Sequence, residues 1–222
     1  MKPDEIGIEQ HAVLYALLAR NTCKAFGEEQ GREMMRIATR AYGRQRGRRM
    51  AENAVRAGRP KDMTSFFLCG EWKGREGENV SEMKYKEDST YSFVHKCAWH
   101  DAWQKYGIRS YGSLYCLDID DAICEGFAGS FGLQVEQAIG KGDDCCIFHW
   151  SEGTDTETLK ELRKTHDHIL PFSFHCKELA FCVYDTLRQA DPAAAAEIIA
   201  KTKAEFEDLY GRETGTIFPS LI

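Results

Sequence analysis

The sequence lacks several features that would place it in large classes of protein. No run of apolar residues approaches the roughly 18 that a membrane-spanning helix needs, and the N-terminus lacks the apolar core of a signal peptide. Positive charge is in deficit, because 29 Lys and Arg stand against 35 Asp and Glu, for a net charge of −6. This balance argues against an electrostatic nucleic-acid binder. We therefore expect a cytoplasmic protein that binds neither nucleic acid nor membranes.

Disorder and internal repetition are also missing. Hydrophobic side chains make up 43% of the 222 residues and aromatic ones 11%, which is the composition of a folded chain with a real core. No repeat and no low-complexity linker divides the sequence. We expect a single domain over residues 1–222, with a helical N-terminal part (1–60), a sheet-containing part (61–155) and a helical C-terminal part (156–222).

Helical periodicity dominates both ends of the chain. Leu14, Leu17 and Leu18 recur at helical spacing, and Gly27 is a plausible end for that helix. Near the C-terminus, Asp191-Pro192 combines an N-cap residue with a proline in the first turn, which predicts the start of a helix.

The middle of the chain has a different character. Residues 79–94 and 133–150 each predict two strands around a polar turn, and short helices are expected at 98–106 and 120–127. The order of helices, hairpin, helices, hairpin and helices predicts an α+β fold. An antiparallel sheet of about four strands, built from two hairpins, would be packed with the N- and C-terminal helices.

Cysteine is unusually frequent. The odd number of nine and the chain length argue against a secreted disulfide scaffold, so free thiols are expected. The default role for each is that of a small buried apolar residue. No C-x-x-C pair occurs, and spacing alone therefore gives only a weak metal signal.

Three cysteines occur at places where chain segments are expected to meet. Cys97 ends the first hairpin and opens a helix, Cys116 directly precedes the next helix, and Cys146 lies on the last strand. Three thiolates and a water would form an open zinc-type site. A thiol at a helix N-terminus, such as Cys97, is instead a candidate nucleophile. The sequence leaves both interpretations open.

Strand alternation divides the end of the second hairpin between two faces. Cys146, Phe148 and Trp150 share one face, whereas Cys145 and His149 lie on the other. Only one of the two adjacent cysteines can point into a given site, and the sequence does not decide which.

Polar residues near these thiols are candidates for supporting roles. His100 follows Cys97 by three residues and would share its side of a helix. Asp118, Asp120 and Asp121 can supply a ligand or a general base, or simply cap a helix. A basic helix contributes Arg44, Arg46, Arg48 and Arg49, one of which can hold a substrate carboxylate, although a solvated helix face is the alternative. His166, His168 and His175 form a looser group, in which His175 is expected to be a hydrogen-bonded core residue.

Several of these motifs follow one another in a recognisable order. A strand ends in Cys97 and a short helix follows; Cys116 precedes Asp120-Asp121-Ala122 and Glu125-Gly126-Phe127; and Gly142-Asp143 precedes Cys146-Ile147-Phe148. Together with Tyr42-Gly43 and Gly47-Arg48 upstream, residues 10–155 resemble the L-2-amino-thiazoline-4-carboxylic acid hydrolase family. This chain departs from the family pattern in two places: Ala98 stands where proline is common, and Cys145 precedes Cys146.

The resemblance implies a hydrolase that opens a small five-membered ring at a carbon bonded to both nitrogen and sulfur. The product would be an N-carbamoyl amino acid with a thiol. The family pattern points to Cys97, Cys116, Asp120 and Cys146 as catalytic residues, with the three thiols as metal ligands if zinc or another divalent ion is used. Arg48, His100 and Trp150 are expected to contact substrate.

Other interpretations remain open at this point. The order of sheet and helices also resembles vinyl-reductase-like domains, small-ligand-binding modules in which comparable cysteines can hold zinc. The chain is thus a hydrolase, a non-enzymatic ligand-binding or metal-sensing domain, or a structural domain whose cysteines fill the core. A small molecule is the expected partner, and a homodimer is one of the open oligomeric states.

Overall fold

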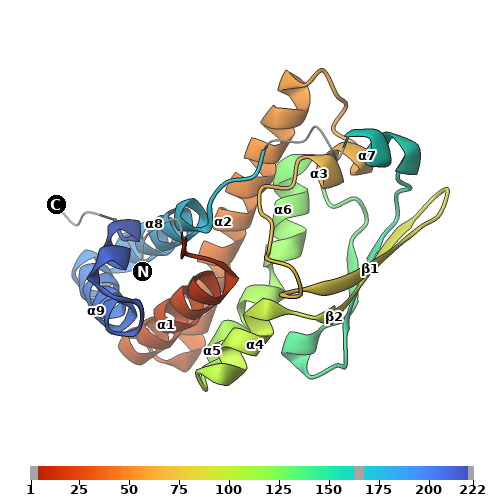
Figure 1. Cartoon of the computed structure of the whole chain (residues 1–222). Helices are drawn as coiled ribbons and strands as arrows, with labels where there is room; N and C mark the ends of the chain where they lie inside the picture. The colour runs from red at the N-terminus through yellow and green to blue at the C-terminus, as the bar shows by residue number, and fades with distance from the viewer. Residues whose placement is uncertain (1–4, 163–167, 220–222) are drawn as a thin grey trace. The chain divides into compact units, whose positions relative to one another are not determined.

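The computed structural model describes residues 5–162 and 168–219 and confirms the α+β class (Figure 1). The helices are α1 (Ile8–Phe26), α2 (Glu28–Arg56), α3 (Met63–Leu68), α4 (Ala98–Lys105), α5 (Arg109–Gly112), α6 (Ile119–Phe127), α7 (Thr156–Leu162), α8 (Phe172–Ala190) and α9 (Pro192–Tyr210). The strands are β1 (Val80–Tyr85), β2 (Thr90–Lys96), β3 (Gln134–Gln137) and β4 (Cys146–Trp150). Short 3-10 helices are η2 (Tyr115–Leu117), η3 (Ile139–Lys141) and η4 (Arg212–Ile217).

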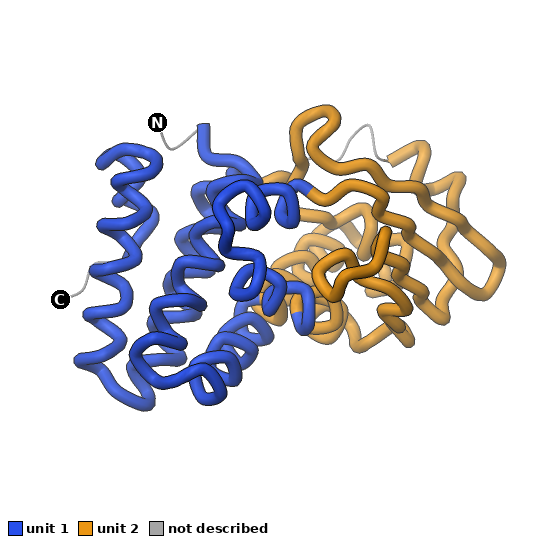
Figure 2. Tube along the Cα trace, turned by 90° about the horizontal axis from the view of Figure 1, so that it is seen from below, with its two compact units in different colours: residues 1–42, 98–118, 171–222 blue, residues 43–97, 119–170 orange. Residues whose placement is uncertain are grey.

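The chain forms two compact units, each assembled from segments that are distant in sequence (Figure 2). Unit 1 contains residues up to 42, residues 98–118 and residues from 171 onward, and unit 2 contains residues 43–97 and 119–170. The boundary within α2 falls after Tyr42, so this helix contributes to both units. The single domain expected from the sequence stays a prediction.

Unit 1 is helical and is built around α1. This helix packs against α4, α8 and α9, and its apolar residues Leu14, Leu17 and Leu18 are buried. It ends at Phe26, directly before Gly27, as predicted. Asp191 also behaves as predicted, because its carboxylate accepts hydrogen bonds from the backbone N–H groups of Ala193 and Ala194 at the start of α9.

A chain of buried polar side chains crosses the core of unit 1. Trp99 Nε1 donates to His11 Nδ1 at 3.1 Å, His11 Nε2 lies 3.3 Å from Tyr42 Oη, and Tyr42 Oη lies 3.5 Å from His175 Nδ1. Because the indole occupies Nδ1, neutral His11 carries its proton on Nε2. His175 is thus a hydrogen-bonded core residue, as expected. His166 lies outside the described residues.

Unit 2 contains the sheet, whose strand order is β1-β2-β4-β3 with antiparallel pairing throughout. The two predicted hairpins are confirmed, and they join through β2 and β4. The register pairs Thr90 with Trp150 and Val94 with Cys146. This central pairing brings the end of the first hairpin beside the start of the last strand.

One face of the sheet is covered by helices of the same unit. Trp150 packs in a core cluster with Phe127 and Cys124 of α6 and with Met50 of α2. The remaining buried members of that cluster are Ala51, Ala54, Met63, Cys69 and Phe131. The apolar faces of the sheet and of the two helices are therefore buried against one another.

Glycines allow the part of α2 within unit 2 to approach α6 closely. A Cβ atom on Gly43 would lie 2.6 Å from Ala122 Cβ, and one on Gly47 would lie 2.7 Å from Phe127 N and still nearer Ile123 O. On the facing helix, a Cβ on Gly126 would overlap the backbone of Arg44. These glycines belong to the motifs that carry the family resemblance, and in the structure they set the contact distance between the two helices.

Candidate active site

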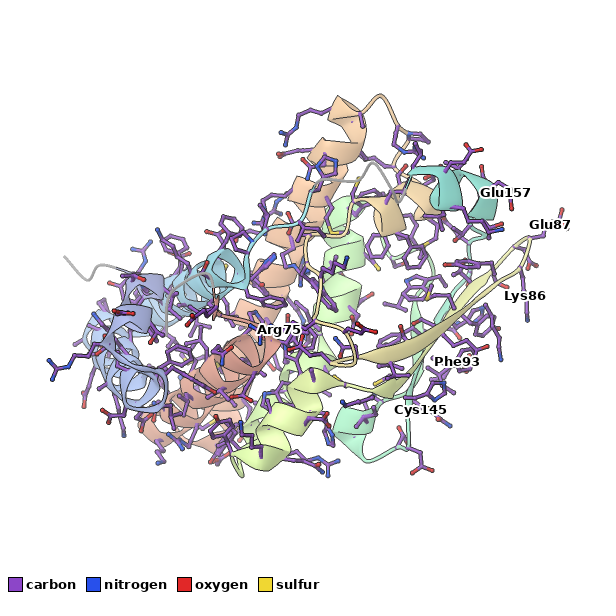
Figure 3. The ribbon with its side chains drawn as sticks, viewed as in Figure 1. Arg75, Lys86, Glu87, Phe93, Cys145 and Glu157 are labelled. Carbon is purple, nitrogen blue, oxygen red and sulfur yellow. The ribbon has the colours of Figure 1, made fainter. Side chains whose placement is uncertain are left out.

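The structure decides which of the two adjacent cysteines faces the interior. Cys146 is buried in a small cluster with Ala138 and Ile139, and its Sγ accepts a hydrogen bond from Ile139 N at 3.4 Å. Cys145 lies on the other face, where its thiol is 3.5 Å from Gln137 Oε1. Figure 3 labels Cys145 and Phe93, which lie on the sheet face opposite Cys146.

Cys97 lies beside the cluster that contains Cys146. It follows β2 directly, is half-buried, and packs against that cluster together with Val94. The pairing of Val94 with Cys146 accounts for this arrangement, because the end of β2 runs alongside the start of β4. Two of the three thiols singled out from the sequence are therefore neighbours in unit 2.

Asp120 lies in the first turn of α6, and its negative charge acts on Cys146. Burial, with smaller contributions from the negative charges of Cys97 and Asp120, raises the pKa of Cys146 to about 11, while the hydrogen bond from Ile139 N opposes the rise. Burial likewise raises the pKa of Asp120 to about 6, while the Arg46 guanidinium opposes that rise. A carboxyl group with a pKa near 6 can both accept and release a proton close to neutral pH. Cys146 thus lies within electrostatic range of both Cys97 and Asp120.

A buried ion cluster joins Arg46 and Arg49 of α2 to Glu71, which follows α3. Glu71 is fully buried, and its two carboxylate oxygens accept hydrogen bonds from Arg49 Nε at 2.9 Å and Arg49 Nη2 at 3.0 Å. Arg46, with a side chain that is 5% exposed, lies 3.7 Å from the same carboxylate. Sequence inspection did not single out Glu71, because nothing local marks a glutamate as the buried partner of two arginines.

These contacts show which of the four arginines expected to hold a substrate carboxylate already pair with an acidic side chain of the protein. Arg46 and Arg49 are engaged by Glu71, and Arg44 pairs with Glu125 at 2.7 Å. Arg48 is exposed, and it forms no hydrogen bond or ion pair with any other residue in the described ranges. Its expected role as a substrate contact stays a prediction.

Cys116 belongs to unit 1. It is half-buried on η2, beside Tyr15, whose pKa is raised mainly by burial and in part by the negative charge of Cys116. Two residues later, Asp118 forms ion pairs with Arg36 and Arg40. Its carboxylate oxygens lie 2.8 Å from Arg36 Nε and 2.7 Å from Arg40 Nη2. A pocket that combines Cys116 with Cys97 and Cys146 stays a prediction.

The two other expected substrate contacts differ in their surroundings. His100 is half-buried on α4 in unit 1; its Nε2 atom is enclosed without a hydrogen-bond partner among the described residues, and burial lowers the pKa of its imidazole. Trp150 is 6% exposed and packs in the core cluster of unit 2. Contact of either side chain with substrate remains a prediction.

A protein-bound metal ion requires several donor side chains gathered at one place. Within residues 5–162 and 168–219, no three His, Cys, Asp or Glu side chains are gathered as a metal-binding group. Zinc or another divalent ion therefore stays a prediction from the sequence, and no chemical step below depends on one. In the same ranges, no helix has the length and apolarity needed to span a membrane.

Family comparison adds an independent observation to this geometry. The family model described as L-2-amino-thiazoline-4-carboxylic acid hydrolase matches residues 7–150, which is more than half of the chain. The chain therefore belongs to this hydrolase family. The match includes Cys97, Asp120 and Cys146 and ends with β4, so α7, α8 and α9 lie beyond it. No curated protein and no solved structure matches, and the vinyl-reductase-like topology stays a prediction.

Proposed function

We propose that the protein is a hydrolase for a small cyclic sulfur-containing amino acid derivative of the 2-aminothiazoline-4-carboxylate type. The observation that carries the proposal is the raised pKa of Asp120, whose charge reaches Cys146, within the matched residues. The family description supports the substrate class. The buried carboxyl group supplies the acid–base chemistry that such a ring opening requires.

The reaction is written as the addition of one water molecule. Asp120 accepts a proton from water as the oxygen bonds to the ring carbon that carries both nitrogen and sulfur; the π pair of the carbon–nitrogen double bond moves to the ring nitrogen, which takes that proton from Asp120. The carbon–sulfur bond then breaks and its electron pair stays on sulfur, while Asp120 accepts the proton of the new hydroxyl as the carbonyl forms and passes it to the departing thiolate. The product is an N-carbamoyl amino acid with a free thiol, and Asp120 is again ready to accept a proton.

The two thiols have supporting roles in this proposal. With its pKa at about 11, Cys146 is protonated at neutral pH and therefore acts as a hydrogen-bond donor to the departing sulfur. Cys97 is half-buried beside the same cluster, and its proposed role is to contact substrate. Water, activated by the carboxylate, is the nucleophile.

Turnover of 2-aminothiazoline-4-carboxylate, followed by mass spectrometry of the N-carbamoyl product, tests the proposal. We expect Asp120→Asn to lower kcat by roughly 100-fold or more, because the proton-transfer group is removed. Cys146→Ser should lower kcat by about 10-fold, because the shorter bond to the serine Oγ leaves the donor farther from the departing sulfur. Cys145→Ser is the matched control, since it alters a thiol on the same strand but the opposite face, and it should stay within about twofold of wild type.

Two results would count against the proposal. One is the absence of the N-carbamoyl product from thiazoline and thiohydantoin carboxylates with the folded wild-type protein. The other is equal activity of Cys145→Ser and Cys146→Ser together with full activity of Asp120→Asn.

A further inference from the structure

A second feature of unit 2 is a groove on the outer side of α2. Its volume is about 480 Å³, and its lining includes Arg48, Glu52, Val55 and Arg56 from α2, Lys61 from the following segment and Gly126 from α6. Residues 52, 55 and 56 follow Arg48 by four, seven and eight positions, so they share one face of the helix. The volume lies within the range of small-molecule sites.

The charge of this groove is opposite in sign to that of the chain. Three cationic side chains line it against one carboxylate, in a protein whose net charge is −6. Arg56 lies 3.8 Å from Glu52, and this pair is well exposed. Arg48 and Lys61 have no hydrogen-bond or ion-pair partner in the described part of the chain. Two positive charges are therefore left without a counter-charge from residues 5–162 and 168–219.

Arg48 and Lys61 could in principle serve to hydrogen-bond the C-terminal carbonyl groups of α2 and α6, but backbone N–H groups already do so. The last carbonyls of α2 already accept backbone hydrogen bonds, from Ala57 N to Asn53 O at 3.0 Å and from Arg59 N to Ala54 O at 2.9 Å. At the end of α6, Ala128 N donates to Cys124 O at 3.1 Å. Arg48 and Lys61 are thus not needed to satisfy helix-terminal carbonyls.

The groove also offers an apolar contact. Val55 is 56% exposed, which is high for a valine in a structured helix, and it lies between the charged positions. Gly126 lets the groove wall run close to the α2 backbone, because any side chain there would overlap Arg44. None of Cys97, Asp120 and Cys146 is among the described residues that line this space.

We propose that this groove binds a small molecule with a dianionic oxyanion group of the phosphate-monoester type, at a site separate from the reacting group. Two unpartnered cations match two negative charges, and the guanidinium of Arg48 can bind two oxyanion oxygens at once while Lys61 acts as a point charge. Val55 contacts the carbon skeleton that carries the oxyanion. The proposal does not depend on the reaction at Asp120.

Direct binding measurements on the intact 222-residue chain test this site without turnover. Inorganic phosphate, glycerol phosphate and succinate are each titrated by NMR at constant ionic strength. We expect saturable binding of both phosphates, and weaker binding of succinate, because its two charges are spread over two carboxylates. Arg48→Gln should weaken phosphate binding by roughly tenfold, the loss of one charge-assisted bidentate contact, and Lys61→Gln by a smaller factor.

Two further variants separate a built site from general charge attraction. Lys73→Gln removes an exposed cation of the same unit outside the groove and should leave the affinity within about twofold. Glu52→Gln should tighten phosphate binding roughly threefold, because a competing negative charge is removed, and a damaged fold cannot produce that gain. Non-saturating titrations, or equal effects of Arg48→Gln and Lys73→Gln, would overturn the proposal. Retained phosphate binding in a protein that makes no N-carbamoyl product would instead refute the hydrolase proposal alone.

Discussion

At the scale of single residues, Asp120 shows how burial changes the chemistry of a common side chain. Its ordinary pKa is near 3.8, but burial raises it to about 6, and Arg46 keeps it from rising further. A fully solvated aspartate would be a weak base at neutral pH, whereas this one matches the pH at which it would work. The same change makes the ionised form a cost to the folded state.

Asp120→Asn should therefore stabilise the protein at neutral pH while lowering activity. Because the folded pKa is raised, the contribution of Asp120 to stability is complete below pH 4 and is lost as the pH rises through about 6. An asparagine does not ionise, so its advantage over wild type should grow between pH 4 and 7 to as much as about 2 kcal/mol, allowing for partial exposure. Urea unfolding at pH 4.5 and 7.5 measures it.

The exposed Asp144→Asn serves as the control, with a change of less than about 0.5 kcal/mol expected at both pH values. A constant difference between Asp120→Asn and wild type over this pH range would contradict the assigned environment.

The wild-type kcat/KM should also rise with pH through about 6 and then level, in keeping with a base of that pKa.

At the scale of elements, the contact between the second part of α2 and α6 explains why small residues recur in the motifs. Gly43 and Gly47 lie one turn apart on α2, and Gly126 faces them from α6. Close approach of these helices brings the Arg46 guanidinium within electrostatic range of Asp120. A helix pair separated by larger side chains would leave Asp120 without that opposing charge.

Gly47→Ala should destabilise the protein by about 3 kcal/mol, although alanine is the better helix former. The added Cβ would meet Ile123 O and Phe127 N, which are backbone atoms that cannot rotate away. Gly70→Ala is the matched control, because the nearest atom to its Cβ would be 3.9 Å away. Denaturant unfolding of both variants measures the difference, and similar stabilities would rule out the tight contact.

At the scale of the whole molecule, each of the two units contains its own cluster of buried polar side chains. The Trp99, His11, Tyr42 and His175 chain lies in unit 1, and the Arg46, Glu71 and Arg49 cluster lies in unit 2. Each cluster joins segments that are far apart in sequence. Loss of one partner leaves the others buried without compensation, and the cost is therefore large.

Glu71→Gln should destabilise unit 2 by about 3–5 kcal/mol, because two arginines lose their buried counter-charge. Hydrogen exchange followed by mass spectrometry should show faster exchange in residues 43–57 and 119–127, with a smaller effect in α8 and α9. Glu125→Gln is the control: its pair with Arg44 is exposed, and its loss should cost less than about 1 kcal/mol. Uniform acceleration across both units would show that they do not respond separately.

What the sequence determined by itself is local in origin. Helical periodicity, Gly27 and the Asp191-Pro192 pair predicted helix positions, and alternation placed Cys146, Phe148 and Trp150 on one strand face, because each signal depends on neighbours within a few residues. Only the tertiary structure decided that β2 pairs with β4, that Cys146 rather than Cys145 faces inward, and that Glu71 holds Arg49. These outcomes depend on burial and charge balance between segments distant in sequence, which no local pattern contains.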